Sequence, residues 1–191
     1  MHEYMAPVDL TRCYRMLNHG PVVLVSARHG ERANVMSASW TTPLDFDPPK
    51  IIVILDKQSF TRKLLEASGE LVISIPQRKI AEQVLLAGSK TGHDGDKFER
   101  AGLEFFPATI VGAPLVKDCA GWLECRLIPE PANQEKYDMF IVEVVAAWSD
   151  PRVFSEGRWH FAGEEDRTIH YQSGGAFFMT GETFVCDEKG A

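Results

Sequence analysis

The stretch Ala33-Asn34-Val35-Met36-Ser37-Ala38-Ser39-Trp40-Thr41-Thr42 decides the fold that we predict for this chain. Apolar runs rich in β-branched residues lie on either side of it, at 21–26 and 50–55. The turn sequences 28–31 and 43–49, which contain Gly, Asp and Pro, separate the stretch from these runs. This pattern predicts three short strands joined by turns.

The middle strand has an unusual composition for a strand in a core. Small or hydroxyl-bearing residues occupy positions 37, 38, 39, 41 and 42, where a buried sheet favours Val or Ile. Small side chains let another group approach the backbone, and hydroxyl and N–H groups can hydrogen-bond to that group. We therefore predict that this strand faces a ligand.

Length and composition favour a single domain. The 191 residues, of which 45% are hydrophobic, can bury one good core. The sequence has no internal repeat, no low-complexity segment and no linker that would divide it. We expect one domain over residues 1–191, with an irregular tail at 150–191 that packs on the core or on a partner subunit.

Charge and cysteine usage exclude several classes of protein. A net charge of −7 argues against a nucleic-acid or anionic-membrane surface, and no apolar run approaches the ~20 residues of a membrane-spanning helix. The N-terminal residues lack the apolar core of a signal peptide. Cysteines 13, 119, 125 and 186 are scattered, and no Cys/His pair has zinc-site spacing, so we expect reduced thiols, a cytoplasmic location and no metal.

The remaining pattern predicts a mainly β fold. We expect helices from Asp9 or Thr11 to Leu17, from Ser59 to Gly69, from Arg78 to Gly88, and from Asp96 to Gly102. Further strands are expected at 70–76, 115–127 and 139–148, with an exposed loop at 88–95 and a turn at 129–133. This count favours a closed or nearly closed antiparallel Greek-key barrel over a doubly wound sheet. GxGxxG and GxxxxGK[ST] are absent, so a Rossmann or P-loop site is not supported.

The order of these features resembles the flavin reductase-like family, which has the FMN-binding split β-barrel fold, and most closely its flavoredoxin-like branch. The resemblance covers roughly residues 15–180. It rests on the segments 20–26, 34–40, 47–51, 59–61, 69–76, 96–98, 120–126, 170–171 and 174–175. The resemblance implies a homodimeric FMN protein, either an NADH- or NADPH-dependent flavin reductase or an electron carrier, with a monooxygenase or another redox protein as a possible partner.

A phosphate group favours N–H groups at a helix N-terminus together with hydroxyls and cations. Ser59 and Thr61 at the start of the predicted helix provide these groups, and Arg62 and Lys63 add positive charge. The family places the FMN phosphate near this region. The alternative is that Ser59 serves only as a helix cap.

The resemblance assigns the flavin ring to the ligand-facing strand. Asn34 matches the family's Asn beside the flavin, although such a residue is also common in turns. Trp40 would cover the ring, or would be an ordinary core or dimer-contact aromatic. The strand residues implied to bind the cofactor are Asn34, Val35, Met36, Ser37, Ala38, Ser39, Trp40 and Thr41.

Two further residues are implied to support the flavin. Lys97 matches a family lysine that would favour the anionic reduced flavin, and its alternative is a solvated surface lysine. His170 lies in a tail that closes over the flavin or nicotinamide in this family, and we assign it to binding or packing. Hydride transfer needs no protein base, so no catalytic acid or base is predicted.

One departure from the family concerns the electron donor. Many relatives carry Gly-Asp-His before the late strand, with the His near the nicotinamide or flavin, whereas this chain has Glu135-Lys136-Tyr137-Asp138. This departure leaves FMN binding intact and puts efficient NAD(P)H use in question. Three hypotheses remain: an NAD(P)H-dependent flavin reductase, an FMN electron carrier, and a non-catalytic barrel whose hydroxyl-rich strand is only structural.

Overall fold

The computed structural model describes Val8, Asp9, Thr11, Met16, Leu17 and residues 20–186. The helix predicted before Gly20 falls largely on residues outside this set. Within the described residues, no helix is long and apolar enough to cross a membrane.

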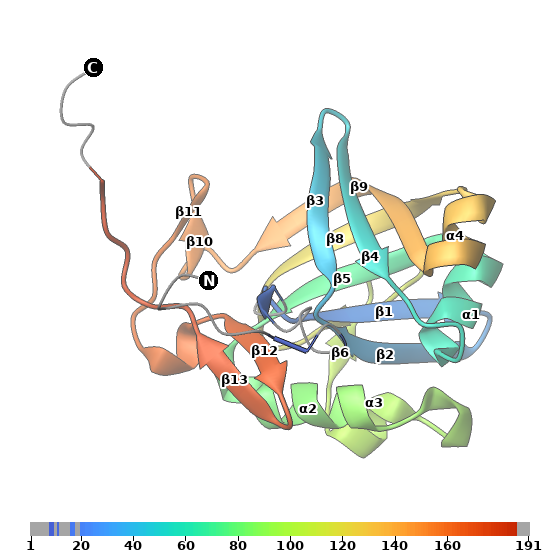
Figure 1. Ribbon diagram of the computed structural model, residues 1–191, viewed down its shortest axis with the longest axis horizontal. Helices are drawn as coiled ribbons and strands as arrows, with labels where there is room; N and C mark the ends of the chain where they lie inside the picture. Colours follow the sequence, from blue (N-terminus) through green and yellow to red (C-terminus); the bar gives the residue numbers. More distant parts are fainter. Residues whose placement is uncertain (1–7, 10, 12–15, 18–19, 187–191) are drawn as a thin grey trace.

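One seven-stranded antiparallel sheet, in the order β2-β1-β5-β8-β9-β4-β3, dominates the molecule (Figure 1). Its strands are β1 (Val23–His29), β2 (Arg32–Ala38), β3 (Thr41–Phe46), β4 (Pro49–Ile54), β5 (Glu70–Pro76), β8 (Cys119–Ile128) and β9 (Met139–Ser149). The two edge strands, β2 and β3, are joined by only Ser39 and Trp40. The sheet must therefore curl until its edges meet at that junction, which makes it a barrel.

The prediction of one strand over 33–42 is wrong, because the stretch divides at Ser39 and Trp40. β2 pairs with β1, with Asn34 opposite Ala27, whereas β3 pairs with β4, with Thr41 opposite Val53. After Trp40 the chain therefore leaves the β1–β2 pair and joins β4 at the opposite edge of the sheet. The predicted turn at 43–49 is shorter than expected, because β3 continues to Phe46.

The apolar run at 21–26 lacks alternation because both faces of β1 are buried. Val23 and Val25 point into the barrel core, where Leu64 and Leu65 of α1 (Phe60–Ser68) also pack. Leu24 belongs to a second core layer, beneath α2 (Ala81–Ser89) and α3 (Lys97–Ala101). Figure 1 shows α2 and α3 along the side of β1 and β2, and α1 at one end of the barrel.

Local capping signals place two of the helices, α1 and α3, as predicted, whereas the helix predicted from Arg78 begins as the 3-10 turn η2 (Arg78–Ile80) and continues as α2 to Ser89 without a side-chain cap. The Ser59 side chain caps α1, which ends at Gly69 with φ 72°, and Asp96 caps α3, which ends at Gly102 with φ 65°. The turn predicted at 129–133 is wrong, because α4 (Pro131–Tyr137) begins there. Proline fits the first turn of a helix, where its missing N–H has no partner to lose.

Two smaller corrections concern the strands outside the main sheet. The strand predicted at 115–127 is split by a turn, which separates β7 (Leu115–Val116) from β8. The tail from 150 is more regular than predicted. The other short elements are η2 (Arg78–Ile80), η3 (Gly92–Asp94), β6 (Phe105–Phe106), β10 (Phe154–Ser155), β11 (Arg158–Trp159), η4 (Glu164–Asp166), β12 (Ile169–Ser173) and β13 (Ala176–Met179).

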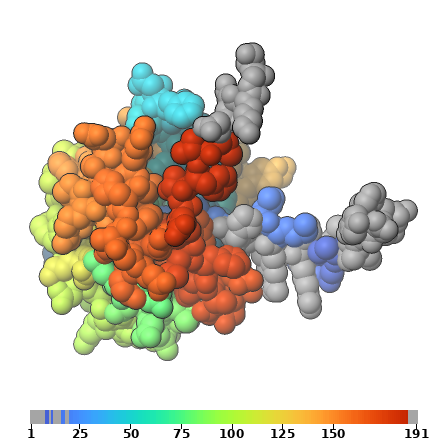
Figure 2. Space-filling view, turned by 90° about the vertical axis from the view of Figure 1, so that its left-hand side faces the viewer, coloured from blue at the N-terminus to red at the C-terminus, as the bar shows by residue number. Residues whose placement is uncertain are grey.

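The tail covers one side of the barrel. The N–H of Val22 donates to the carbonyl of Ile169 over 3.1 Å, which fixes the β12–β13 hairpin beside the start of β1. In Figure 2 the segment from 150 onward, coloured orange to red, covers much of the visible face. The hairpin therefore packs against the start of the barrel.

Candidate functional site

A cavity of about 730 Å³ lies between β2, the start of α1 and the loop after α2. Its lining contains four lysines (Lys57, Lys63, Lys90 and Lys97) and one carboxylate, that of Asp56. The remaining lining residues are Asn34, Met36, Ser37, Gln58, Ser59, Phe60, Ala87, Gly88, Thr91, Gly92 and His93. The excess of positive charge suits an anionic ligand.

Asn34 is fixed at the base of this cavity. Its Nδ2 donates to Oγ1 of Thr61 over 2.8 Å, and both side chains are buried. A Cβ on Gly92 would lie only 2.4 Å from Oδ1 of Asn34, so the backbone of the loop after α2 packs directly on the amide. Asn34 is therefore a strand residue rather than a turn residue, and Thr61 acts behind it without lining the cavity.

Ser59 caps α1 and also faces the cavity. Its Oγ accepts from the N–H of Arg62 at 3.4 Å, as a helix cap does, and donates to Sδ of Met36 at 3.0 Å. The same residue lines the cavity, at the positive end of the α1 dipole. The helix start is thus open to the cavity.

Lys97 is not a solvated surface lysine. Its residue exposure is 5%, and it lines the cavity. Burial lowers the pKa of its ammonium to about 8, and the charge of Arg100 acts in the same direction. No carboxylate among the described residues forms an ion pair with it. A buried cation without a partner favours an anionic group in the cavity.

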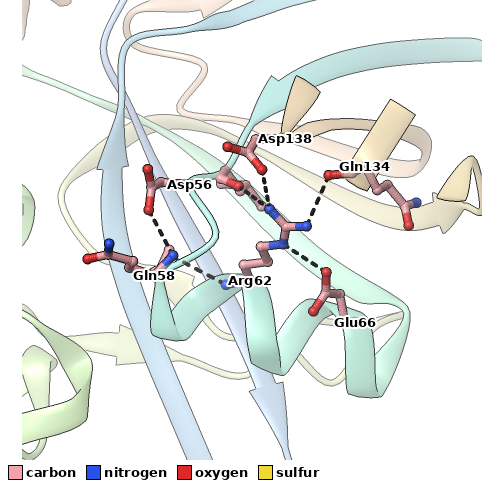
Figure 3. Close-up of polar contacts among 8 residues, drawn as sticks. Asp56, Gln58, Arg62, Glu66, Gln134 and Asp138 are labelled. Carbon is pink, nitrogen blue, oxygen red and sulfur yellow. Dashed lines mark hydrogen bonds and ion pairs between the residues drawn. The ribbon is translucent and has the colours of Figure 1, made fainter. Parts of the chain in front are cut away.

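Arg62 does not add its charge to the cavity, contrary to the prediction. Its guanidinium contacts Asp138 at 2.6 Å, Glu66 at 2.8 Å and the carbonyls of Leu55 and Gln134 at 3.1 and 3.0 Å (Figure 3). These contacts attach α1 to the end of α4. Since Asp138 lies 76 residues away in the chain, local sequence could not indicate this role.

The other strand residues fall into two groups. Met36, Ser37, Ala38, Ser39 and Trp40 line a cavity of about 360 Å³ at the β2–β3 junction, together with Ile54, Asp56, Tyr137 and Asp138. Val35 points to the opposite face and is buried in the second core layer, and Thr41 lines none of these cavities. The period-2 alternation of the strand explains the position of Val35.

His170 lies outside these cavities. It forms a bridge with Pro21 where the β12–β13 hairpin meets the barrel, which agrees with a packing role. Sequence reasoning missed Gly88 and Gly92, because 88–95 has the composition of an exposed loop. The available signal was the glycine at 92, because its backbone lies so close to Asn34 that a Cβ would not fit.

A family model described as the flavin reductase like domain matches residues 15–172. The chain belongs to the flavin reductase-like family. It is 39% identical over 179 residues to protein YddH of Escherichia coli K12, covering 92% of this chain and 95% of YddH. The predicted family and its split-barrel fold are thereby confirmed.

Two solved structures of this family resemble the fold described above. An FMN-binding domain of a flavin reductases-like enzyme from Shewanella baltica OS155 is 46% identical, with a TM-score of 0.86, and the match covers 95% of this chain and 97% of that one. Flavoredoxin of Desulfovibrio vulgaris (Miyazaki F) is 26% identical, with a TM-score of 0.76, covering 88% of this chain and 90% of that one.

Proposed function

We propose that the chain is an FMN-binding oxidoreductase whose cofactor occupies the lysine-rich cavity. The observation that carries this proposal is Lys97, a buried cation that faces the cavity and forms no ion pair among the described residues. FMN provides a phosphate dianion and a ring that becomes anionic on reduction, so the residues present fit the group. The FMN-binding relative from Shewanella baltica supports this proposal.

Bound FMN would supply hydride and single-electron chemistry, which no side chain here provides. Ser59, Lys57 and Lys63 at the start of α1 would hold the phosphate through hydrogen bonds and charge. Asn34 is held in one orientation by Thr61 and Gly92, so it can present its amide without a loss of side-chain entropy. Lys97 would oppose the negative charge of the reduced ring.

The first candidate activity is an NADH- or NADPH-dependent flavin reductase. A second candidate is an FMN electron carrier that does not use a pyridine nucleotide directly. The sequence at the end of α4 favours the second candidate. Residues 135–138 contain no histidine that could lie near a nicotinamide, and Asp138 forms an ion pair with Arg62. The similarity to flavoredoxin also supports the carrier.

We also propose that the protein is a cytoplasmic homodimer that can pass electrons to a redox partner such as a monooxygenase. Apolar residues on β8, β9 and the tail line a groove of about 350 Å³ that a second subunit could cover, including Trp122, Trp148, Phe154 and Trp159. Phe46, at the end of β3, is 97% exposed. Exposed apolar surface of this kind is typical of subunit interfaces.

Anaerobic titration tests the proposed function. The purified protein should take up about one FMN per chain, and this is measured by calorimetry and by the yellow absorbance. Addition of NADH or NADPH that bleaches the bound flavin identifies the reductase. Bleaching by dithionite alone identifies the carrier. Failure to bind FMN at tens of micromolar would contradict both candidates and leave the non-catalytic barrel.

A further inference from the structure

Two walls of the proposed FMN cavity touch each other at its outer rim. One wall is the loop after α2, which includes His93, and the other is formed by residues 56–60, at the start of α1. The Nε2 atom of His93 lies 3.2 Å from the carbonyl oxygen of Gln58. Since a carbonyl oxygen can only accept a hydrogen bond, Nε2 carries the hydrogen and donates it.

The ring of Phe60 gives the same imidazole a second partner. The ring centroids of Phe60 and His93 lie 5.1 Å apart with the planes inclined by 64°, which is an edge-to-face arrangement. The Cζ atom of Arg32, on β2, lies 4.7 Å from the centroid of the Phe60 ring and helps to hold that ring in place. We call His93, Gln58 and Phe60 together the rim clasp.

The rim clasp lies on the solvent side of the cavity. Its polar members, His93 and Gln58, are exposed, whereas Lys97, deeper in the same cavity, is 5% exposed. Ser59, which we propose as a phosphate ligand, lies between Gln58 and Phe60 in the chain. A flavin with its ring near Lys97 and its phosphate near Ser59 would therefore have the rim clasp at its phosphate end.

The backbone of the loop is anchored independently of the rim clasp. Gly92 packs on Asn34, and Nη1 of Arg100 donates to the carbonyl of Thr91 over 3.3 Å. The N–H of His93 donates to the hydroxyl of Thr91 over 3.2 Å. The His93 side chain can therefore leave its two partners while the backbone stays in place, because exposed side chains change rotamer rapidly.

We propose that the rim clasp is a gate that FMN passes on entry and exit, with the His93 imidazole as its moving part. This inference rests on the proposed function, because it requires FMN in this cavity. The rim clasp consists of protein contacts alone, so it closes whether or not a flavin is bound. A gate of this kind slows entry and exit by the same factor and leaves the affinity unchanged. FMN is then a resident cofactor that exchanges slowly with free flavin, rather than a released product.

Stopped-flow fluorescence tests the gate: mixing the full chain with FMN gives the association rate constant, and dilution of the complex gives the dissociation rate constant. His93→Ala should raise both rate constants by the same factor, about tenfold, with the dissociation constant within twofold of wild type. Tenfold corresponds to ~1.4 kcal/mol, close to the net value of one hydrogen bond and one ring contact. His93→Gln keeps a donor for the Gln58 carbonyl and His93→Phe keeps a ring beside Phe60, so each should give a smaller increase.

Riboflavin should show the same factor as FMN in these variants, because the gate does not act on the phosphate. His29→Ala is the control, since this exposed histidine at the end of β1 does not line the cavity, and its rate constants should equal those of wild type.

Unchanged rate constants in His93→Ala would overturn the inference. A rise in the dissociation rate constant alone, confined to FMN, would also overturn it, because it would show that His93 binds the phosphate. Failure of wild-type protein to bind FMN is a separate result, which contradicts the proposed function itself.

Discussion

Asn34 on β2 and Thr61 on α1 are joined by a buried hydrogen bond of 2.8 Å from amide to hydroxyl. The bond connects the two segments that sequence reasoning assigned separately to the flavin ring and to the phosphate. It also means that a change at Thr61 should act on the cofactor through Asn34.

A double-mutant cycle tests this connection. Thr61→Val keeps the shape of the side chain but leaves the buried Asn34 amide without its acceptor, which should lower the free energy of unfolding by about 1–3 kcal/mol. FMN and riboflavin should lose affinity equally, because Thr61 does not face the phosphate. Asn34→Ala combined with Thr61→Val should cost less than the sum of the single changes. Additive effects on FMN affinity would show that the two residues act independently.

Gly92→Ala tests the close approach of the loop after α2 to Asn34. The new Cβ would lie 2.4 Å from Oδ1 of Asn34, so either the loop or the amide must move. Overpacking of this kind typically costs about 1–3 kcal/mol, and FMN affinity should fall with it. Gly163→Ala is the control, since its Cβ would meet no atom within 4 Å. Equal stability and FMN affinity in both variants would contradict the fixed position of Asn34.

Glu124 provides a test of acid stability away from the cavity. Burial alone raises the pKa of this carboxyl, but hydrogen bonds from the Thr109 side chain, from Trp148 and from the N–H groups of Thr109 and Ile110 outweigh burial and lower the pKa to about 2. The folded-state pKa lies below the unfolded value, so the contribution is present at neutral pH and is lost as the pH falls from about 4.5 to about 2.

The corresponding variant is Glu124→Gln, which replaces one acceptor with a donor. At pH 7 it should lower the free energy of unfolding by about 3 kcal/mol, which is the free energy that corresponds to lowering the pKa of Glu124 from 4.5 to about 2. In urea unfolding the difference from wild type should shrink at pH 3. Glu104→Gln, at an exposed carboxylate paired with Lys117, is the control. A difference that does not change with pH would show that Glu124 is not ionised in the folded protein.

The proposed homodimer can be measured directly. Sedimentation should give twice the chain mass of 21.4 kDa at micromolar protein. Phe46→Glu places a charge on a fully exposed aromatic at the end of β3 and should shift the equilibrium toward the monomer. A mass of one chain for wild-type protein with FMN bound would contradict the dimer.

Sequence reasoning succeeded where the determining interactions are local. Ser59 with Gly69, and Asp96 with Gly102, mark helix ends through bonds within a few residues. It failed where the partner is distant in the chain. The break at Ser39 and Trp40 depends on β2 and β3 pairing with different strands. Similarly, the role of Arg62 depends on α4, and the close approach of Gly92 to Asn34 depends on how the loop after α2 packs on β2.

The central claim is that Lys97 faces the flavin, and the midpoint potential of bound FMN tests it most directly. At pH 7 the ammonium is mostly protonated, since its pKa is about 8. Two unit charges ~4 Å apart attract by about 1–4 kcal/mol between bulk water and a dielectric of 20, which corresponds to some tens of millivolts for two electrons. By pH 9 much of this charge is lost.

The decisive measurement is an anaerobic reductive titration of wild type, Lys97→Met and Lys63→Met at pH 7 and pH 9. Lys97→Met should lower the midpoint potential by some tens of millivolts at pH 7 and by less at pH 9, with oxidised FMN affinity nearly unchanged. Lys63→Met, in the same cavity at the helix start, should weaken the oxidised and reduced forms equally and leave the potential unchanged. An unchanged potential in Lys97→Met protein that still binds FMN would contradict the account.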